Sequence, residues 1–153
     1  MIIRPARLDD APAMSAFLQE LSALGKRTRR SDLEFVQSHY VENPSSIRCS
    51  VAEDADGTIL GFQALTLAGP DNEFGVEAGW GVIGTHVSPH AARRGVGRAL
   101  FSATREAAQS AGLRKIDASI GDDNAEGLAY YEAMGFRTYR MPEGRICKCY
   151  EVS

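Results

Sequence analysis

The residues best suited to chemistry lie in one segment, 87–100, with the sequence VSPHAARRGVGRAL. Its arginines and glycines alternate closely: Arg93, Arg94, Gly95, Gly97 and Arg98. We expect a strand to end at Val87 and a helix to begin at Gly95 or Val96. The N–H groups at a helix start lack intrahelical partners and carry partial positive charge. Together with the arginines, they predict a site for an anion such as a pyrophosphate.

Two common phosphate-binding motifs do not fit this segment. A P-loop needs Lys and then Ser or Thr after its second glycine, but Arg98 and Ala99 follow Gly97. A dinucleotide-binding fingerprint needs a third glycine where Leu100 stands, and it belongs to an early strand–helix unit. A pyrophosphate loop of another kind remains, beside the simpler interpretation of a helix start that happens to contain glycine.

A second segment, 124–136, has the sequence NAEGLAYYEAMGF. With RRGVGRAL at 93–100, it resembles the two signature motifs of the GNAT acetyltransferase superfamily, at the separation typical of that superfamily. The resemblance is strong over 87–136 and looser elsewhere, where it rests on element order. One departure is Ala92, where the family often has Gln or Arg; Arg93 and Arg94 are expected to supply the charge instead.

The resemblance implies an α/β fold and a cosubstrate. The fold is a mixed, twisted sheet of about six to seven strands, splayed at its centre and flanked by about four helices. Acetyl-CoA enters at the splay. The expected cofactor-binding residues are Val87, Arg93, Arg94, Gly95, Val96, Gly97, Arg98, Ala99 and Asn124. Val87 would offer main-chain groups, including an oxyanion donor, or would simply be a core residue. Asn124 would contact the pantetheine or cap a helix.

Tyr131 matches the tyrosine that the family uses as general acid toward the departing thiolate. Tyr131 lies three residues after Leu128, so the two share one helix face, and Tyr130 is the alternative if the register differs. The family's basic glutamate falls near Gly81, which cannot act. The general base therefore stays open among a water chain and four side chains, namely Glu73, Glu77, His86 and Asp117.

The function implied is N-acetyl transfer from acetyl-CoA to the amine of a small molecule, such as an amino acid or a xenobiotic amine. The amine would attack directly in a ternary complex. A non-catalytic acyl-CoA-binding regulatory module and a protein or peptide N-acetyltransferase are the alternatives. The following side chains could hold a carboxylate on the acceptor or could be solvated: Arg27, Arg29, Arg30, His39 and Tyr40.

Composition excludes several other classes. The 153 residues suit one domain, 1–153, and the formal net charge of −3 argues against nucleic acid as partner. Three cysteines without a signal peptide favour reduced thiols and a cytoplasmic location. Cys147 and Cys149 lack nearby partners in sequence for a metal, so none is expected. We expect no membrane segment, and a homodimer stays open.

The periodicity of apolar residues predicts the elements that position these motifs. The expected strands are 2–7, 47–53, 58–67, 77–87, 115–120, 136–141 and 146–152. The expected helices are 10–24, 31–42, 96–111 and 124–134, with Asp9, Ser31 and Asn124 as candidate caps. This order, with early helices, a strand hairpin and late strand–helix units, predicts mixed α/β topology.

Overall fold

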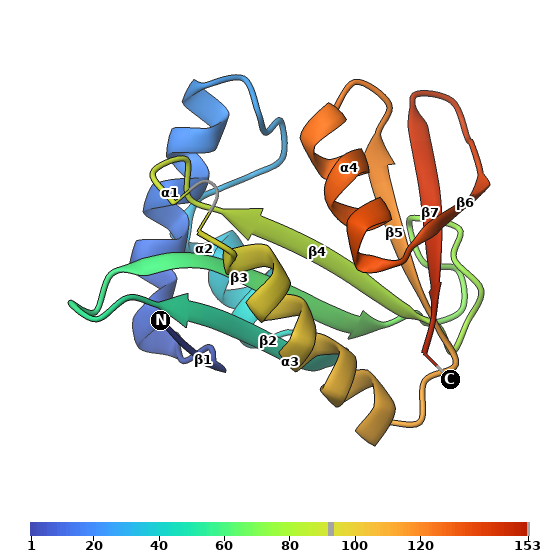
Figure 1. Ribbon diagram of the computed structural model, residues 1–153, viewed down its shortest axis with the longest axis horizontal. Coiled ribbons are helices and arrows are strands. Elements are labelled where there is room, and N and C mark those ends of the chain that lie inside the picture. Colours follow the sequence, from blue (N-terminus) through green and yellow to red (C-terminus); the bar gives the residue numbers. More distant parts are fainter. Residues whose placement is uncertain (92–93, 153) are drawn as a thin grey trace.

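A computed structural model describes residues 1–91 and 94–152. Its seven strands form one sheet in the order β1-β2-β3-β4-β5-β7-β6 (Figure 1). The strands are β1 (Ile2–Pro5), β2 (Ser46–Glu53), β3 (Ile59–Leu67), β4 (Gly81–Val87), β5 (Lys115–Gly121), β6 (Arg137–Arg140) and β7 (Arg145–Glu151). The expected α/β class and strand number are therefore confirmed.

In the described part of the chain, four α-helices flank the sheet. They are α1 (Ala11–Ala23), α2 (Leu33–Val36), α3 (Val96–Ser110) and α4 (Ala125–Met134). A 3-10 turn (Leu8–Asp10) precedes α1, and a π-helical segment (Gln37–Val41) continues α2. In Figure 1, α3 and α4 lie on the near side of the sheet, and α1 and α2 lie behind it. Among the described residues, no helix has the length and apolar character needed to cross a membrane.

The sheet divides at its centre, where β4 meets β5. All other neighbouring strands run antiparallel, whereas β4 and β5 are parallel and pair at two positions, Gly81 with Ile116 and Val82 with Asp117. Beyond these pairs the strands separate, as Figure 1 shows. We call this place the fork. Because their main-chain groups no longer pair with each other, the two strands can accept another extended chain.

Each face of the sheet has its own core, because the side chains of a strand alternate between faces. Phe62 of β3 packs with Met14 and Leu18 of α1 on one face. Leu65 of β3 packs with Phe101 and Phe136 on the other face, toward α3 and α4. We call these the α1 face and the α3 face.

Some local expectations differ from the structure. The central strand begins at Gly81 rather than at residue 77, since 68–80 form a loop. Asp32 rather than Ser31 caps α2, because its carboxylate accepts the N–H of Phe35 at 3.2 Å. Ser31 instead accepts a hydrogen bond on its carbonyl from Ser15 of α1, at 2.6 Å. Ser31, which the sequence predicted as the cap of α2, is therefore bound to the neighbouring helix α1 instead.

Candidate active site

The start of α3 has the backbone that an anion site needs. Gly95 precedes the helix with φ of +74°, a left-handed conformation that favours glycine. The N–H of Ala99 already donates to the carbonyl of Gly95 at 3.1 Å, so its donor is used by the helix. The N–H groups of residues 96–98 precede that first helical bond and have no intrahelical acceptor. Three N–H donors at this helix end are therefore not used by the helix itself.

Gly97, the second glycine of the motif, is required for a different reason. A Cβ on Gly97 would lie 2.6 Å from Cε1 of Tyr130, so α4 packs directly against this point of α3. The hydroxyl of Tyr130 also donates to the Gly97 carbonyl at 2.7 Å. Contact between the helices thus excludes a side chain at this position.

The arginines of the segment are not equivalent. Arg94 makes two hydrogen bonds to Asp54 in the β2–β3 turn, at 3.0 and 3.1 Å. Arg98 is exposed on the first turn of α3 and makes no ion pair with the described part of the chain. Arg93 lies outside the described residues. Arg98 is thus the described arginine whose charge is available beside the unpaired N–H groups.

Tyr131 reaches the fork from α4. Its side chain is 7 % exposed, and its hydroxyl lies 2.8 Å from Oγ1 of Thr85 on β4. Burial raises the pKa of the Tyr131 phenol well above its ordinary value, so the phenol is protonated at neutral pH. The alternative, Tyr130, donates its proton to the Gly97 carbonyl instead. The tyrosine chosen from the motif is the one at the separated strands.

Val87 and Asn124 each have a structural role. Val87 ends β4 opposite Gly61 and packs its side chain on the cluster beneath the start of α3. Its main chain lies where β4 has left β5. Asn124 caps α4, since its Oδ1 accepts the N–H of Gly127 at 3.0 Å. The cap therefore exists whether or not Asn124 also contacts a cofactor.

The α1 face of the fork is aromatic and basic. The ring of His86 on β4 lies tilted against Phe62 and edge-on to Tyr40, with ring centroids 4.7 and 5.4 Å away. Burial and the charge of Arg27 lower the pKa of His86 to about 3, so the ring is neutral. Arg27 donates to the Tyr40 hydroxyl at 3.1 Å. A group entering from this side would meet the cation of Arg27 near a neutral imidazole.

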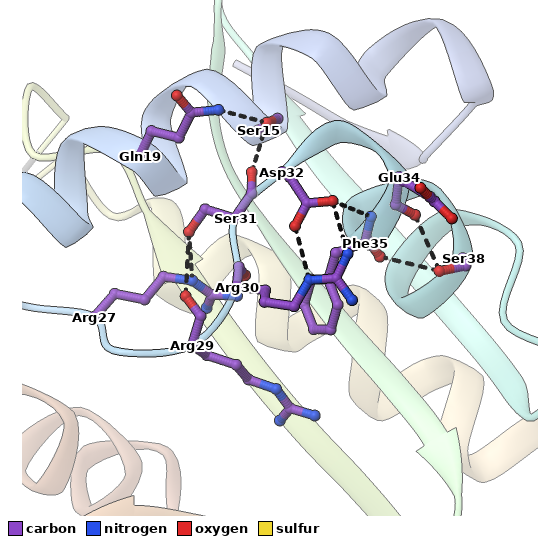
Figure 2. Close-up of polar contacts among 10 residues, drawn as sticks. All are labelled: Ser15, Gln19, Arg27, Arg29, Arg30, Ser31, Asp32, Glu34, Phe35 and Ser38. Atoms are coloured by element: carbon purple, nitrogen blue, oxygen red, sulfur yellow. Dashed lines mark hydrogen bonds and ion pairs between the residues drawn. The ribbon is translucent and has the colours of Figure 1, made fainter.

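The loop between α1 and α2 carries the three clustered arginines (Figure 2). Arg30 pairs with Asp32 at 2.8 Å, and Arg29 points away from that pair and reaches Glu73 of the β3–β4 loop at 2.9 Å. Arg27 donates instead to neutral oxygens, those of Ser31 and the Arg30 carbonyl. Within 1–91 and 94–152, Arg27 is thus the cluster member without a carboxylate partner.

The candidate bases have distinct surroundings. Glu73 is held by Arg29 and lines a pocket of about 260 Å³ on the α1 face, together with His39 and Val82. Asp117 is fully buried at the last β4–β5 pair, accepts a hydrogen bond from Tyr139, and has its pKa raised by burial. Because Val82 pairs with Asp117, this pocket adjoins the closed end of the fork.

Gln63 and Thr85 lie near Tyr131 and were not predicted from the sequence. Gln63 of β3 is fully buried and donates from Nε2 to Thr85 Oγ1 at 2.9 Å and to the Tyr130 hydroxyl at 3.0 Å. A signal did exist, since Gln63 is an amide inside the apolar run ILGFQALTL. A buried polar residue in such a strand calls for partners. Which partners it finds depends on the pairing of β3 with β4.

Other chemistries find less support. Burial raises the pKa of Cys49 to about 12, so this thiol stays protonated and is a poor nucleophile. Cys147 and Cys149 are free thiols. In the described ranges, no group of three or more His, Cys, Asp or Glu side chains could hold a metal ion.

The sheet forks beside a helix start with unpaired N–H groups and carries a buried tyrosine at the fork, an arrangement suited to an acyltransferase that uses a thioester of coenzyme A. The acetyltransferase (GNAT) family matches residues 14–136, and the chain belongs to this family. The resemblance, the enzyme class of acetyl-CoA-dependent N-acyltransferase and acetyl-CoA as cosubstrate are thereby confirmed.

Solved structures agree with this assignment. A GCN5-related N-acetyltransferase from Kribbella flavida is 27% identical, with a TM-score of 0.81 over 98% of this chain and 96% of that one. Two others share the fold at lower identity. They are a ribosomal-protein-alanine N-acetyltransferase from Brucella melitensis (22% identity, TM-score 0.78, 99% of both chains) and yncA from Salmonella typhimurium with its cofactor acetyl-CoA (19%, 0.75, 99% and 94%). No curated protein sequence matches the chain.

Proposed function

We propose that this enzyme acetylates the amine of a small molecule that also carries a carboxylate, such as an amino acid. The observation that carries the proposal is Arg27, a cation without a carboxylate partner in the described chain, beside neutral His86 on the α1 face of the fork. A carboxylate bound to Arg27 would anchor the acceptor there. A pocket of about 260 Å³ lies on the same face beside Val82, and Arg27 and His86 are not among the residues that line it.

The cofactor residues extend this proposal. Acetyl-CoA supplies an activated acetyl thioester. The N–H groups of Val96, Gly97 and Arg98, which have no intrahelical acceptor, would hold its pyrophosphate together with the Arg98 guanidinium. The residues present fit that group, because Gly95 turns the chain into the helix and a Cβ there would meet open space. Val87 would offer main-chain groups to the pantetheine arm, and Asn124 would contact it while capping α4.

Tyr131 would act as the general acid. As the amine nitrogen bonds to the acetyl carbon, the C–S bond breaks and its electron pair stays on sulfur. Tyr131 gives its proton to that sulfur. The phenolate regains a proton from solvent, which receives the proton lost by the amine. Burial favours this role because it keeps the phenol protonated until charge develops on sulfur.

The test measures thiol release with amino acids, their decarboxylated amines and lysine-rich peptides. We expect turnover with amino acids, and Arg27→Gln should raise their KM about tenfold, the effect of a lost charged hydrogen bond. The decarboxylated amines should not respond to this substitution. Arg30→Gln is the matched control, because Arg30 pairs with Asp32. Tyr131→Phe should lower kcat by about 10²–10⁴-fold.

A peptide acceptor is the competing outcome. The ribosomal-protein-alanine N-acetyltransferase from Brucella melitensis shares the fold at 22% identity. Turnover confined to peptides would overturn the small-molecule assignment and leave the cofactor site standing. Binding of acetyl-CoA without thiol release above the spontaneous rate, whichever acceptor is added, would favour a binding module instead.

A further inference from the structure

We propose that Gln63 and Thr85 are positioning residues that direct the proton of Tyr131 toward the cofactor sulfur. They do so through a chain of hydrogen bonds that starts at the main chain of Gly97. The inference rests on the proposed role of Tyr131 as general acid. It adds two residues, on β3 and β4, that lie outside both sequence motifs.

The chain has a fixed direction at its first link. Tyr130 places its hydroxyl 2.7 Å from the carbonyl oxygen of Gly97. A carbonyl can only accept, so the single proton of Tyr130 is used there. The Gln63 side-chain atom facing the Tyr130 oxygen, at 3.0 Å, must therefore donate. That requirement fixes the amide of Gln63 with Nε2, not Oε1, toward the two hydroxyls.

The remaining links follow from this orientation. The second N–H of Gln63 donates to Thr85 Oγ1 at 2.9 Å. The Thr85 hydroxyl must then send its own proton elsewhere, and Gln63 Oε1 does not receive it, since that buried atom has no partner in the described chain. The Tyr131 hydroxyl lies 2.8 Å from Thr85 Oγ1. Either hydroxyl can donate in this contact, and the proposed chain assigns the donor role to Thr85 and the acceptor role to the Tyr131 oxygen.

The consequence concerns the proton of Tyr131 itself. Because its oxygen accepts from Thr85, its own O–H is free for a second acceptor, which the departing sulfur provides. Donation to the phenol oxygen also stabilises the phenolate. Burial raises the pKa of Tyr131, and the hydrogen bond from Thr85 opposes that rise. An ordinary thiol has a pKa of about 8.5 and a phenol about 10, so any lowering eases proton transfer to a thiolate.

Burial of Gln63 supports a dedicated purpose. Its side chain is fully buried among the apolar residues of β3, and its Oε1 has no described partner. An apolar side chain of similar size would avoid the desolvation of that oxygen. The amide offsets this cost because its two N–H groups donate to two hydroxyls, those of Thr85 and Tyr130.

The test uses isosteric substitutions on the full chain with acetyl-CoA and the best acceptor of the panel. Thr85→Val should lower kcat about tenfold or more while the KM for acetyl-CoA changes by less than about twofold. Thr85→Ser keeps the hydroxyl and should restore most of kcat. Gln63→Met should lower kcat in the same way. Thr104→Val is the matched control, because Thr104 is also fully buried but its hydroxyl has no described partner.

A double-mutant cycle separates positioning from structure. If Thr85 acts through Tyr131, then Thr85→Val should not slow the Tyr131→Phe variant further. Wild-type kcat in Thr85→Val, or an equal loss in both backgrounds, would overturn the positioning role and leave the general acid intact. Full turnover in Tyr131→Phe would overturn the general acid itself and with it this inference. If Thr85→Val does not fold, the comparison of Thr85→Ser with Gln63→Met decides in its place.

Discussion

At the scale of single residues, the two glycines of the α3 motif have different physical reasons. Gly95 needs a left-handed backbone, with φ of +74°, whereas Gly97 needs the space that Tyr130 occupies. Sequence motifs do not separate these reasons, because both select glycine. We therefore expect a substitution at Gly97 to disturb the packing of α4 against α3, whatever its effect on cofactor binding.

Gly97→Ala is predicted to destabilise the fold. In an open helix this change would stabilise by about 1 kcal/mol. Here the added Cβ meets the Tyr130 ring at 2.6 Å, and the bond from Tyr130 to the Gly97 carbonyl holds that ring in place. We expect unfolding free energy to fall by about 1–3 kcal/mol, measured by urea denaturation. In a Tyr130→Ala background the same change should stabilise, and a loss there would contradict this explanation.

At the scale of elements, an ion pair joins β1 to the start of α1. Arg4 contacts both carboxylate oxygens of Asp10, at 2.8 and 2.9 Å, and also Glu53 of β2 at 2.6 Å. The N–H of Arg7 donates to the same Asp10 carboxylate at 2.7 Å. Asp10 is 5 % exposed. The hydrogen bond from Arg4 is the main cause that lowers the pKa of Asp10.

This pair predicts how stability depends on pH. A carboxyl whose pKa is lowered on folding stabilises the fold at neutral pH, and that stabilisation is lost as pH falls below the ordinary Asp value of about 3.9. Asp10→Asn should lower the unfolding free energy by about 3 kcal/mol at pH 7. The difference should shrink in thermal melts at about pH 3. Asp32→Asn, in an exposed pair, is the control with the smaller loss. A pH-independent difference would show that Asp10 acts through shape.

At the scale of the whole molecule, the fork joins two halves of the sheet by two β4–β5 pairs. The α3 helix strengthens this junction, because it packs against β2, β3 and β4 and its residue Phe101 contacts Phe136 of the other half. The β3–β4 loop adds a link on the α1 face, where Arg140 of β6 donates to the Phe74 carbonyl at 2.6 Å. Main-chain groups of β4 and β5 beyond the fork nevertheless lack each other as partners.

Coenzyme A is expected to protect these strands from hydrogen exchange. A ligand arm between β4 and β5 would give partners to the amides on the strand edges that face the fork, where the two strands do not pair with each other. We expect slower exchange in peptides covering 83–87 and 118–121 when coenzyme A is added, measured by mass spectrometry. Peptides from β7 are the control, because β7 pairs with β5 and β6 on its two edges. Equal exchange with and without coenzyme A would place the ligand elsewhere.

Local sequence determined the elements and the family of this protein. The amphipathic pattern of 96–111 closely predicted α3, Asn124 marked the start of α4, and two motifs identified the acetyltransferase (GNAT) family. These features depend on residues within about one or two helical turns, so spacing along the chain suffices to find them. The cofactor residues and Tyr131, chosen from the same motifs, stay predictions until they are tested.

The partners of those residues were decided by the tertiary structure. Arg94 forms an ion pair with Asp54, which lies 40 positions earlier in the sequence. Gln63, 67 positions before Tyr130, meets it only because β3 pairs with β4 and α4 packs on α3. A side chain's hydrogen-bond partner depends on strand register and helix packing, which long-range contacts set and no local pattern encodes. The sequence thus determined which residues are candidates for the site, and the fold decided which of them lie together.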